Sequence, residues 1–401
     1  MGLYFLMALL FVALAVLQAL DASLVGLGIL PWFNGMRWLR VHFITLGALT
    51  EVLFGVLPWL VAQKNNLPRP QFRWDIWLAL NSGILSLLVG IPLVNAVPIY
   101  AGGTLVFVAT VLLMGQLWGL RGGGEGTAVS PARKFYLVGL AYFLLGIIIG
   151  TGLWFNWPNW LHIAIPLETH IHANNWGFMS LTFAGLMVDL YPRWTKRQLA
   201  MPHSITPIFW MMTLGALGLV LGPWFDSLVF TVPGLVLHLG STFWLLYNVI
   251  KPLRGDRAAW TPGVWHLISA YVWILVPVLV APFLILGIGN LPGPAIESNA
   301  PQALIYGWLL QVGYAILPYF FRRILEPQAE ATLGGNWLSL ATSHLGGLFL
   351  WLSIFIVSVR GVLQGIAYGF WVVSLIPIAI ELGRIVNAHL AVDNEQLAMN
   401  N

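Results

Sequence analysis

The chain has 401 residues, of which 59% are hydrophobic and only 8% are charged. A soluble globular domain carries about 25% charged residues, so the composition excludes a soluble globule and indicates an integral membrane protein. The net charge of +4 is small and gives no reason to expect a nucleic-acid partner. Because the chain has no cysteine, disulfides, thiolate metal sites, iron–sulfur clusters and covalently attached haem are excluded.

Apolar runs long enough to cross a bilayer recur along the whole chain. A helix needs about twenty apolar residues to cross roughly 30 Å of hydrocarbon. The sequence predicts twelve such helices, which begin near residues 3, 39, 72, 96, 134, 169, 205, 228, 263, 299, 335 and 362. We therefore expect an all-α integral membrane protein with one membrane domain, residues 1–401, in contact with the lipid bilayer.

Lysine and arginine collect in alternate loops, which predicts the orientation. The even-numbered loops carry Lys64, Arg69, Arg73, Arg121, Arg133, Lys134, Arg193, Lys196, Arg197, Lys251, Arg254, Arg257, Arg322 and Arg323. Positively charged loops remain on the cytoplasmic side of a membrane. We therefore expect a multi-pass protein of the plasma (inner) membrane with both termini in the cytoplasm. The odd-numbered loops are poor in positive charge, with the exceptions of Arg37, Arg40 and Arg360.

Three predicted helices begin alike, at a spacing of 130 residues. The matching pairs are His42 with Gly47, His172 with Gly177, and Gln302 with Gly307. In a chain of twelve helices this period predicts three pseudo-symmetric four-helix units, at approximately residues 1–130, 131–260 and 261–401. Small residues are common at helix contacts in membranes, so some recurring glycines are also expected by coincidence.

The nine histidines differ in predicted depth. His162, His203 and His389 fall in loops or the C-terminal tail and are expected to be solvated, and His266 is expected to anchor at the membrane interface. Ionisable groups within a membrane are costly and often functional. The candidate metal ligands are therefore the other five, His42, His170, His172, His238 and His344. For each of the five, and most of all for His238 and His344, the alternative is a neutral imidazole that bonds a carbonyl across a helix contact.

His170 and His172 lie two positions apart on one predicted helix. At about 100° per residue their side chains point about 200° apart, so they cannot bind one ion as a pair spaced by four residues would. They are expected to face two different clefts. Imidazole nitrogen suits iron, copper and zinc, and a flat apolar slot between helices suits haem.

Arg37, Arg40 and Arg360 lie at the predicted outer face, against the general charge bias. Guanidinium groups there could bind haem propionates, and the alternative is that they bind lipid headgroups. The sequence assigns no catalytic residue. Glu51 is a candidate for proton transfer, although it lies nine positions after His42 and about 180° around the helix from it. A hydrogen bond across a helix contact is the alternative role for Glu51.

The stretch ETHIHANNWGFMSLTFAGLMVDLYPRW at residues 168–194, followed by residues 201–222, resembles compact members of the haem–copper oxidase subunit I superfamily. The nearest relatives in this resemblance are C-type cytochrome oxidases, nitric oxide reductases and NnrS-like haem proteins. The resemblance implies twelve helices, cytoplasmic termini and threefold pseudosymmetry. It also implies a haem ligand at His42, a helix with two haem-ligating imidazoles at His170 and His172, and propionate binding at Arg360.

The chain departs from the pattern of this family at two places. The family carries its double-imidazole helix as the tenth helix, whereas here it is the sixth and the tenth carries Gln302. The family's copper site needs a histidine pair on the seventh helix, and residues 205–223 contain no histidine. Copper is therefore a weaker prediction than haem.

The first functional hypothesis is a haem-binding membrane subunit of a respiratory-type oxidoreductase, with one or two b-type haems that transfer electrons and with O₂ or NO reduction as a further option. A redox partner subunit on the outer face, cytochrome c or cupredoxin-like, is then expected. The alternatives are a haem protein that binds NO or O₂ without turnover and, less favoured, a transporter, because transporters usually show two repeats.

Overall fold

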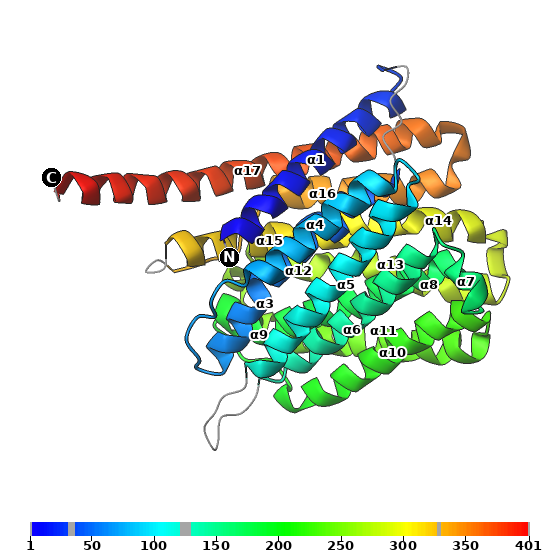
Figure 1. The fold of residues 1–401 in the computed structure, drawn as a ribbon, viewed down its shortest axis with the longest axis horizontal. Helices are drawn as coiled ribbons and strands as arrows, with labels where there is room; N and C mark the ends of the chain where they lie inside the picture. Colours follow the sequence, from blue (N-terminus) through cyan, green and yellow to red (C-terminus); the bar gives the residue numbers. More distant parts are fainter. Residues whose placement is uncertain (1, 31–36, 121–129, 327–329, 400–401) are drawn as a thin grey trace. The chain divides into compact units, whose positions relative to one another are not determined.

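The computed structural model describes residues 2–30, 37–120, 130–326 and 330–399 (Figure 1). All regular structure in these residues is helical, which confirms the predicted all-α class. Ten helices of the described residues are long and apolar enough to cross a membrane, as a multi-pass membrane protein requires. Arg121, which was assigned to a cytoplasmic loop, lies outside the described residues.

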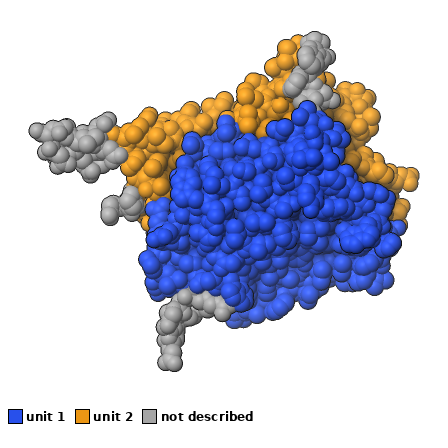
Figure 2. Space-filling model, viewed as in Figure 1, with its two compact units in different colours: residues 1–11, 46–252 blue, residues 12–45, 253–401 orange. Residues whose placement is uncertain are grey.

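Contacts within the chain divide it into two compact units, coloured blue and orange in Figure 2. The first unit holds residues 1–11 and 46–252, and the second holds residues 12–45 and 253–401. Two long helical stretches, residues 2–26 and 37–64, therefore contribute to both units.

The first unit contains most of the first two-thirds of the chain. Its helices are the start of α1 (Gly2–Gly26), then α3 (Thr50–Lys64), α4 (Trp74–Gly90), α5 (Ala96–Gly119), α6 (Arg133–Gly152), α7 (Trp157–Trp160), α8 (Pro166–His172), α9 (Ser180–Thr195), α10 (Ile205–Phe225) and α11 (Leu228–Ile250). Short 3₁₀ turns at Pro202–Ser204 and Lys251–Leu253 flank α10 and α11.

The second unit contains the end of α1 and the last third of the chain. Its helices are α2 (Arg37–His42), α12 (Pro262–Ser269), α13 (Tyr271–Ile285), α14 (Gly293–Leu304), α15 (Leu310–Leu325), α16 (Trp337–Phe355) and α17 (Arg360–Met399). Short 3₁₀ turns occupy Arg257–Ala259, Ile288–Asn290 and Val357–Val359.

Three of the long helices contain a π-helical segment, at Phe43–Leu49 between α2 and α3, Ala173–Met179 between α8 and α9, and Ile305–Leu309 between α14 and α15. The first two segments follow His42 and His172 directly, and the third begins three residues after Gln302. Because π-helical turns are rare and often occur at functional sites, their recurrence indicates these three regions as candidate sites.

Each π-helical segment contains the glycine found in the sequence pattern. A Cβ atom on the glycine would overlap a ring of an earlier helix, at 2.6 Å from Phe11 for Gly47, 2.3 Å from Tyr142 for Gly177 and 2.3 Å from Trp273 for Gly307. The three aromatic residues are themselves spaced by 131 residues. The glycines are therefore required for close approach of an aromatic side chain.

The most extensive helix contacts also recur through the chain, between α4 and α5, between α10 and α11, and between α16 and α17. Small residues allow these pairs to approach closely, as is common in membranes. A Cβ on Gly83 would lie 2.9 Å from the Gly102 carbonyl oxygen, and one on Gly218 would lie 2.7 Å from Gly234 Cα. The approach of α16 to α17 is looser, because a Cβ on Gly346 would lie 3.1 Å from the nearest atom.

Candidate functional site

His42 is the last residue of α2 and precedes the first π-helical segment. Its Nδ1 atom lies 2.8 Å from the carbonyl oxygen of Trp38, and its ring stacks on the Trp38 indole at 4.1 Å between centroids. Because a carbonyl oxygen only accepts hydrogen bonds, Nδ1 carries the proton and Nε2 carries the lone pair. The Trp38 contacts thus orient His42 with a basic Nε2.

His170 and His172 contact different helices of the first unit. The Nδ1 atom of His170 lies 2.9 Å from the Gly146 carbonyl oxygen on α6, and that of His172 lies 2.5 Å from the Leu219 carbonyl oxygen on α10. The two imidazoles therefore contact different helices, as positions two residues apart on a helix allow. In each ring Nδ1 donates to a carbonyl, so the lone pair again lies on Nε2.

Two neighbours of His172 were missed as site residues from the sequence. Glu168 lies one helical turn earlier, with Oε1 3.7 Å from His172 Nε2, and about a quarter of its side chain is exposed. The Trp176 ring lies between two imidazoles, 6.2 Å from His172 and 5.3 Å from His238 between centroids. The sequence signal for both was the spacing of four residues, from Glu168 to His172 and again from His172 to Trp176.

His238 is buried on α11. Its Nε2 atom lies 3.3 Å from the Ser180 hydroxyl, and a Cβ on Gly215 would lie 2.7 Å from its backbone nitrogen. His238 therefore fills a tight contact between α10 and α11, with a polar neighbour on α9. This arrangement matches the structural alternative considered for His238, although the partner is a hydroxyl instead of a carbonyl.

His344 is held by hydrogen bonds at both ring nitrogens. The Trp273 Nε1–H donates to His344 Nδ1 at 3.1 Å, so the ring proton lies on Nε2, which donates to the Ser269 hydroxyl at 2.8 Å. The Ser269 hydroxyl in turn donates to the Trp265 carbonyl. His344 is therefore part of a continuous hydrogen-bonded chain, and metal binding would require breaking it.

His266 differs from its expected place at the membrane interface, because it is completely buried. Its Nε2 atom lies 2.8 Å from the Ser339 hydroxyl. Gly335, at a φ of +88°, lies against the ring, and a Cβ there would come within 2.5 Å of His266 Cδ2. The chain before α16 thus covers His266, an arrangement that helix periodicity does not reveal.

Gln302, the third member of the repeated pattern, is buried in the second unit and accepts a hydrogen bond from the Tyr368 hydroxyl. The Arg40 guanidinium lies 5.0 Å above the Tyr368 ring, and the Tyr306 ring packs edge-on at 5.4 Å. Arg37 also interacts electrostatically with Tyr368 and Tyr306. Two arginines and two tyrosines therefore surround the position at which the other repeats carry histidine.

Arg360, the remaining candidate for propionate binding, begins α17 in the second unit. Its Nε–H donates to the carbonyl oxygen of Ser353 at 3.1 Å. This bond ties the start of α17 to the end of α16. Arg360 therefore has a structural role at this helix junction, whether or not it also binds an anion.

Glu51 lies at the second position of α3 and is completely buried. Among the described residues, neither carboxyl oxygen has a hydrogen-bond partner. The Asn81 side chain on α4 and the Tyr4 side chain on α1 are close enough to interact with the carboxyl group. Glu51 is thus an acid with polar neighbours and no cation beside it in the described residues of the first unit.

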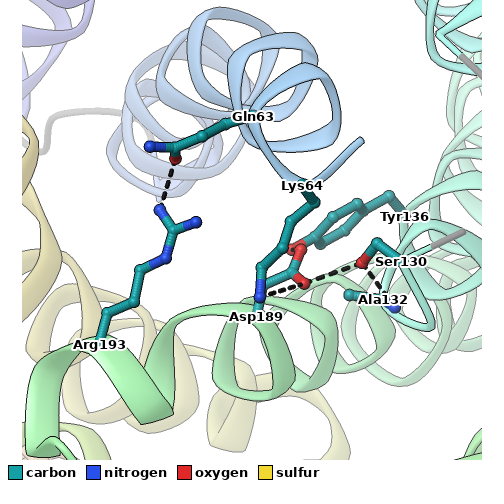
Figure 3. A network of polar contacts seen from close by, with 7 residues as sticks. All are labelled: Gln63, Lys64, Ser130, Ala132, Tyr136, Asp189 and Arg193. Atoms are coloured by element: carbon teal, nitrogen blue, oxygen red, sulfur yellow. Dashed lines mark hydrogen bonds and ion pairs between the residues drawn. The ribbon is translucent and has the colours of Figure 1, made fainter. Parts of the chain in front are cut away.

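Asp189 is the second buried acid of the first unit and lies in a polar network (Figure 3). It accepts hydrogen bonds of 2.9 Å from the Ser130 and Tyr136 hydroxyls, and the Lys64 ammonium lies 3.7 Å from its Oδ1. Beside it, Arg193 donates to the Gln63 side chain at 2.5 Å. The network ties the ends of α3 and α9 to the start of α6.

The described residues contain no group of three or more histidine, cysteine, aspartate or glutamate side chains that could hold a metal ion. The histidines instead occur singly or in pairs that point apart, with His42 in the second unit and His170 and His172 in the first. Compared with known proteins, the chain matches no protein-family model and no curated protein.

Proposed function

We propose that the chain is a haem-binding membrane subunit of a respiratory-type oxidoreductase, in which His42 and one or both of His170 and His172 bind haem. The orientation of these imidazoles carries the proposal. All three donate Nδ1–H to a backbone carbonyl. This hydrogen bond is the usual way in which proteins fix the tautomer of a metal-binding histidine and raise the basicity of its Nε2.

The donor set of the described residues fits a haem group. A protein-built copper or zinc site needs three or four ligating side chains together, and no such group occurs in the described residues. In haem, the porphyrin nitrogens coordinate the iron, so the protein needs to supply only one or two axial ligands. When bound, it would supply one-electron transfer through its iron. Copper remains the weaker part of the proposal.

The surroundings of each imidazole suggest distinct roles. His170 and His172 contact α6 and α10, so one helix can present ligands to two sides. The carboxyl group of Glu168 lies beside His172 Nε2 and would have to move for a ligand to bind there. The two arginines of α2 would hold propionate groups near His42, which lies on the same helix.

We further propose twelve membrane-spanning helices in three pseudo-symmetric units. The two spans added to the ten long apolar helices are α4, which is shorter, and the continuous helix of α8, the second π-helical segment and α9. The three π-helical segments and the three glycine–aromatic contacts support the repeat. Cytoplasmic termini, the plasma membrane and an outer redox partner complete the proposal.

Absorption spectroscopy of the purified full chain tests this function. A haem protein with two axial histidines is expected to show sharp α-bands on reduction and no shift with carbon monoxide. A Soret band that shifts with carbon monoxide would instead support the binding of NO or O₂. A preparation made in haem-replete cells that shows no haem absorption would contradict the proposal.

A further inference from the structure

The two buried acids of the first unit lie in opposite surroundings, and Glu51 has the unusual ones. It is the fifteenth of 28 residues in the apolar helix Arg37–Lys64. At about 1.5 Å per residue it lies about 20 Å from either end of that helix. An ionised carboxylate at such a depth is costly unless it is paired or hydrogen-bonded.

The described residues of the first unit give Glu51 no cationic partner that would stabilise a carboxylate. No salt bridge to Glu51 occurs among the described residues, and neither of its oxygens accepts a hydrogen bond there. The Asn81 amide donates to the Trp77 carbonyl at 3.0 Å, and its Oδ1 atom has no donor in the same part of the chain. A protonated Glu51 could donate to that oxygen, whereas a carboxylate could not.

Tyr4 lies close to the segment of Glu51 and interacts with charged surface residues. Its Cβ packs on Gly55, one turn beyond Glu51, and its ring lies 5.6 Å from the ring of Phe72. It interacts electrostatically with Glu51 and also with Arg73 and Asp75. Arg73 and Asp75 form an exposed ion pair. A tyrosine hydroxyl both donates and accepts hydrogen bonds, so it can relay a proton.

The scaffold does not require an acid at the position of Glu51. One repeat later, Gly185 also packs on aromatic residues, and a Cβ there would lie 2.6 Å from Tyr136 Cε1 and 3.0 Å from Phe135 Cβ. The residue that corresponds to Glu51 at the 130-residue spacing is Leu181, which is also buried. A buried leucine therefore fills the equivalent place, so packing alone does not explain an acid at Glu51.

We propose that Glu51 is a proton-binding site, held as a neutral carboxylic acid, which exchanges its proton with the surface at Arg73 and Asp75 through the Tyr4 hydroxyl. The ligand of this site is the proton itself. The site is separate from the proposed haem-binding histidines and does not depend on them.

The protonation state is tested by labelling the full chain in lipid vesicles with dicyclohexylcarbodiimide, an apolar reagent that adds to protonated carboxylic acids within membranes. At neutral pH we expect the adduct on the peptide that contains Glu51 and its loss in the Glu51→Gln variant. Asp189, whose carboxylate has donors and a cation, is the internal control and should remain unlabelled. An unlabelled Glu51 would overturn the proposal, and so would equal labelling of both acids.

The route is tested by infrared spectroscopy of hydrogen–deuterium exchange. The carboxylic C=O band that disappears in Glu51→Gln should shift on transfer to D₂O. Because a positioned relay group accelerates proton transfer strongly, Tyr4→Phe should slow this shift on the order of tenfold or more. Tyr142→Phe, which removes a hydroxyl bonded to the Thr213 carbonyl, is the matched control and should leave the rate unchanged. An unchanged rate in Tyr4→Phe would exclude the route.

Neither test requires a bound cofactor. Absence of haem would leave the result at Glu51 intact, and failure of labelling would leave the haem proposal intact. Retained helical circular dichroism and a single elution peak for each variant would show that the substitutions did not unfold the protein.

Discussion

The long helix that contains His172 and the one that contains Gln302 share a backbone design and differ in chemistry. Both have a π-helical segment whose glycine lies against an aromatic ring. His172 donates to the Leu219 carbonyl and keeps its lone pair on Nε2, whereas the Gln302 oxygen is already taken by the Tyr368 hydroxyl. The comparison shows that neighbouring side chains and carbonyls decide what an equivalent position can bind.

The two helices also differ at their opposite ends. Asp189 on α9 is buried with two hydroxyl donors and Lys64 nearby. On α15, Arg322 pairs with Glu381 at 2.6 Å, and both side chains are about one-fifth exposed. The helix of His172 is therefore anchored by a buried network, and the helix of Gln302 by a partly solvated ion pair.

The largest expected effect comes from the shared glycines. In Gly177→Ala and Gly307→Ala the new Cβ would lie 2.3 Å from a ring atom. The Tyr142 and Trp273 rings cannot shift easily because each donates a hydrogen bond, from the Tyr142 hydroxyl to the Thr213 carbonyl and from Trp273 Nε1 to His344 Nδ1. We expect each substitution to lower the free energy of unfolding by about 3 kcal/mol, as overpacking does.

Gly313→Ala is the matched control for the two glycine variants. Gly313 lies on α15, and a Cβ there would meet nothing within 4 Å. Because alanine favours the helix more than glycine does, the unfolding free energy of Gly313→Ala should be unchanged or up to about 1 kcal/mol higher than that of the unsubstituted protein. Thermal unfolding in detergent measures all three variants. Equal stability of Gly307→Ala and Gly313→Ala would refute the close approach of the Trp273 ring to Gly307.

The anchors at the two helix ends should differ in strength. Asp189→Asn removes the charge that faces Lys64 and replaces one acceptor oxygen by a donor, with an expected cost of about 2 kcal/mol. Glu381→Gln breaks a partly solvated pair and should cost about 1 kcal/mol or less. Denaturation of the two variants side by side provides the measurement. A larger loss in Glu381→Gln than in Asp189→Asn would reverse this part of the comparison.

A similarly small effect is expected at Tyr368. In Tyr368→Phe the buried Gln302 oxygen loses its donor, which should cost about 1 kcal/mol in unfolding free energy. Haem content should not change, because Gln302 is not a ligand in the proposed function. A loss of haem in this variant would show that the Gln302 region does contribute to cofactor binding.

Much of the fold follows from the sequence because apolar runs report membrane helices directly. The expected starts near residues 96, 205 and 228 coincide with the first residues of α5, α10 and α11. Helix geometry is also consistent with the contacts of His170 and His172 with two different helices. These features depend on local periodicity, which a single sequence carries.

Features that depend on contacts between distant parts of the chain could not be predicted from the sequence. The burial of His266 depends on the segment around Gly335. The hydrogen bond that occupies the Gln302 side-chain oxygen depends on Tyr368 on α17. The π-helical segments were also missed, although the five-residue spacing from His42 to Gly47 and the aromatic residues 131 positions apart were visible signals.

The most direct test of the haem proposal is the haem content per chain and the reduced absorption spectrum of His172→Ala, compared with His344→Gln. His172 has its lone pair on Nε2, beside the Glu168 carboxyl group, whereas both ring nitrogens of His344 are hydrogen-bonded, to Trp273 and Ser269. We expect His172→Ala to lose a haem or change its spectrum, and His344→Gln to keep both. Unchanged haem content and spectrum in His172→Ala, or loss of haem only in His344→Gln, would contradict the assignment.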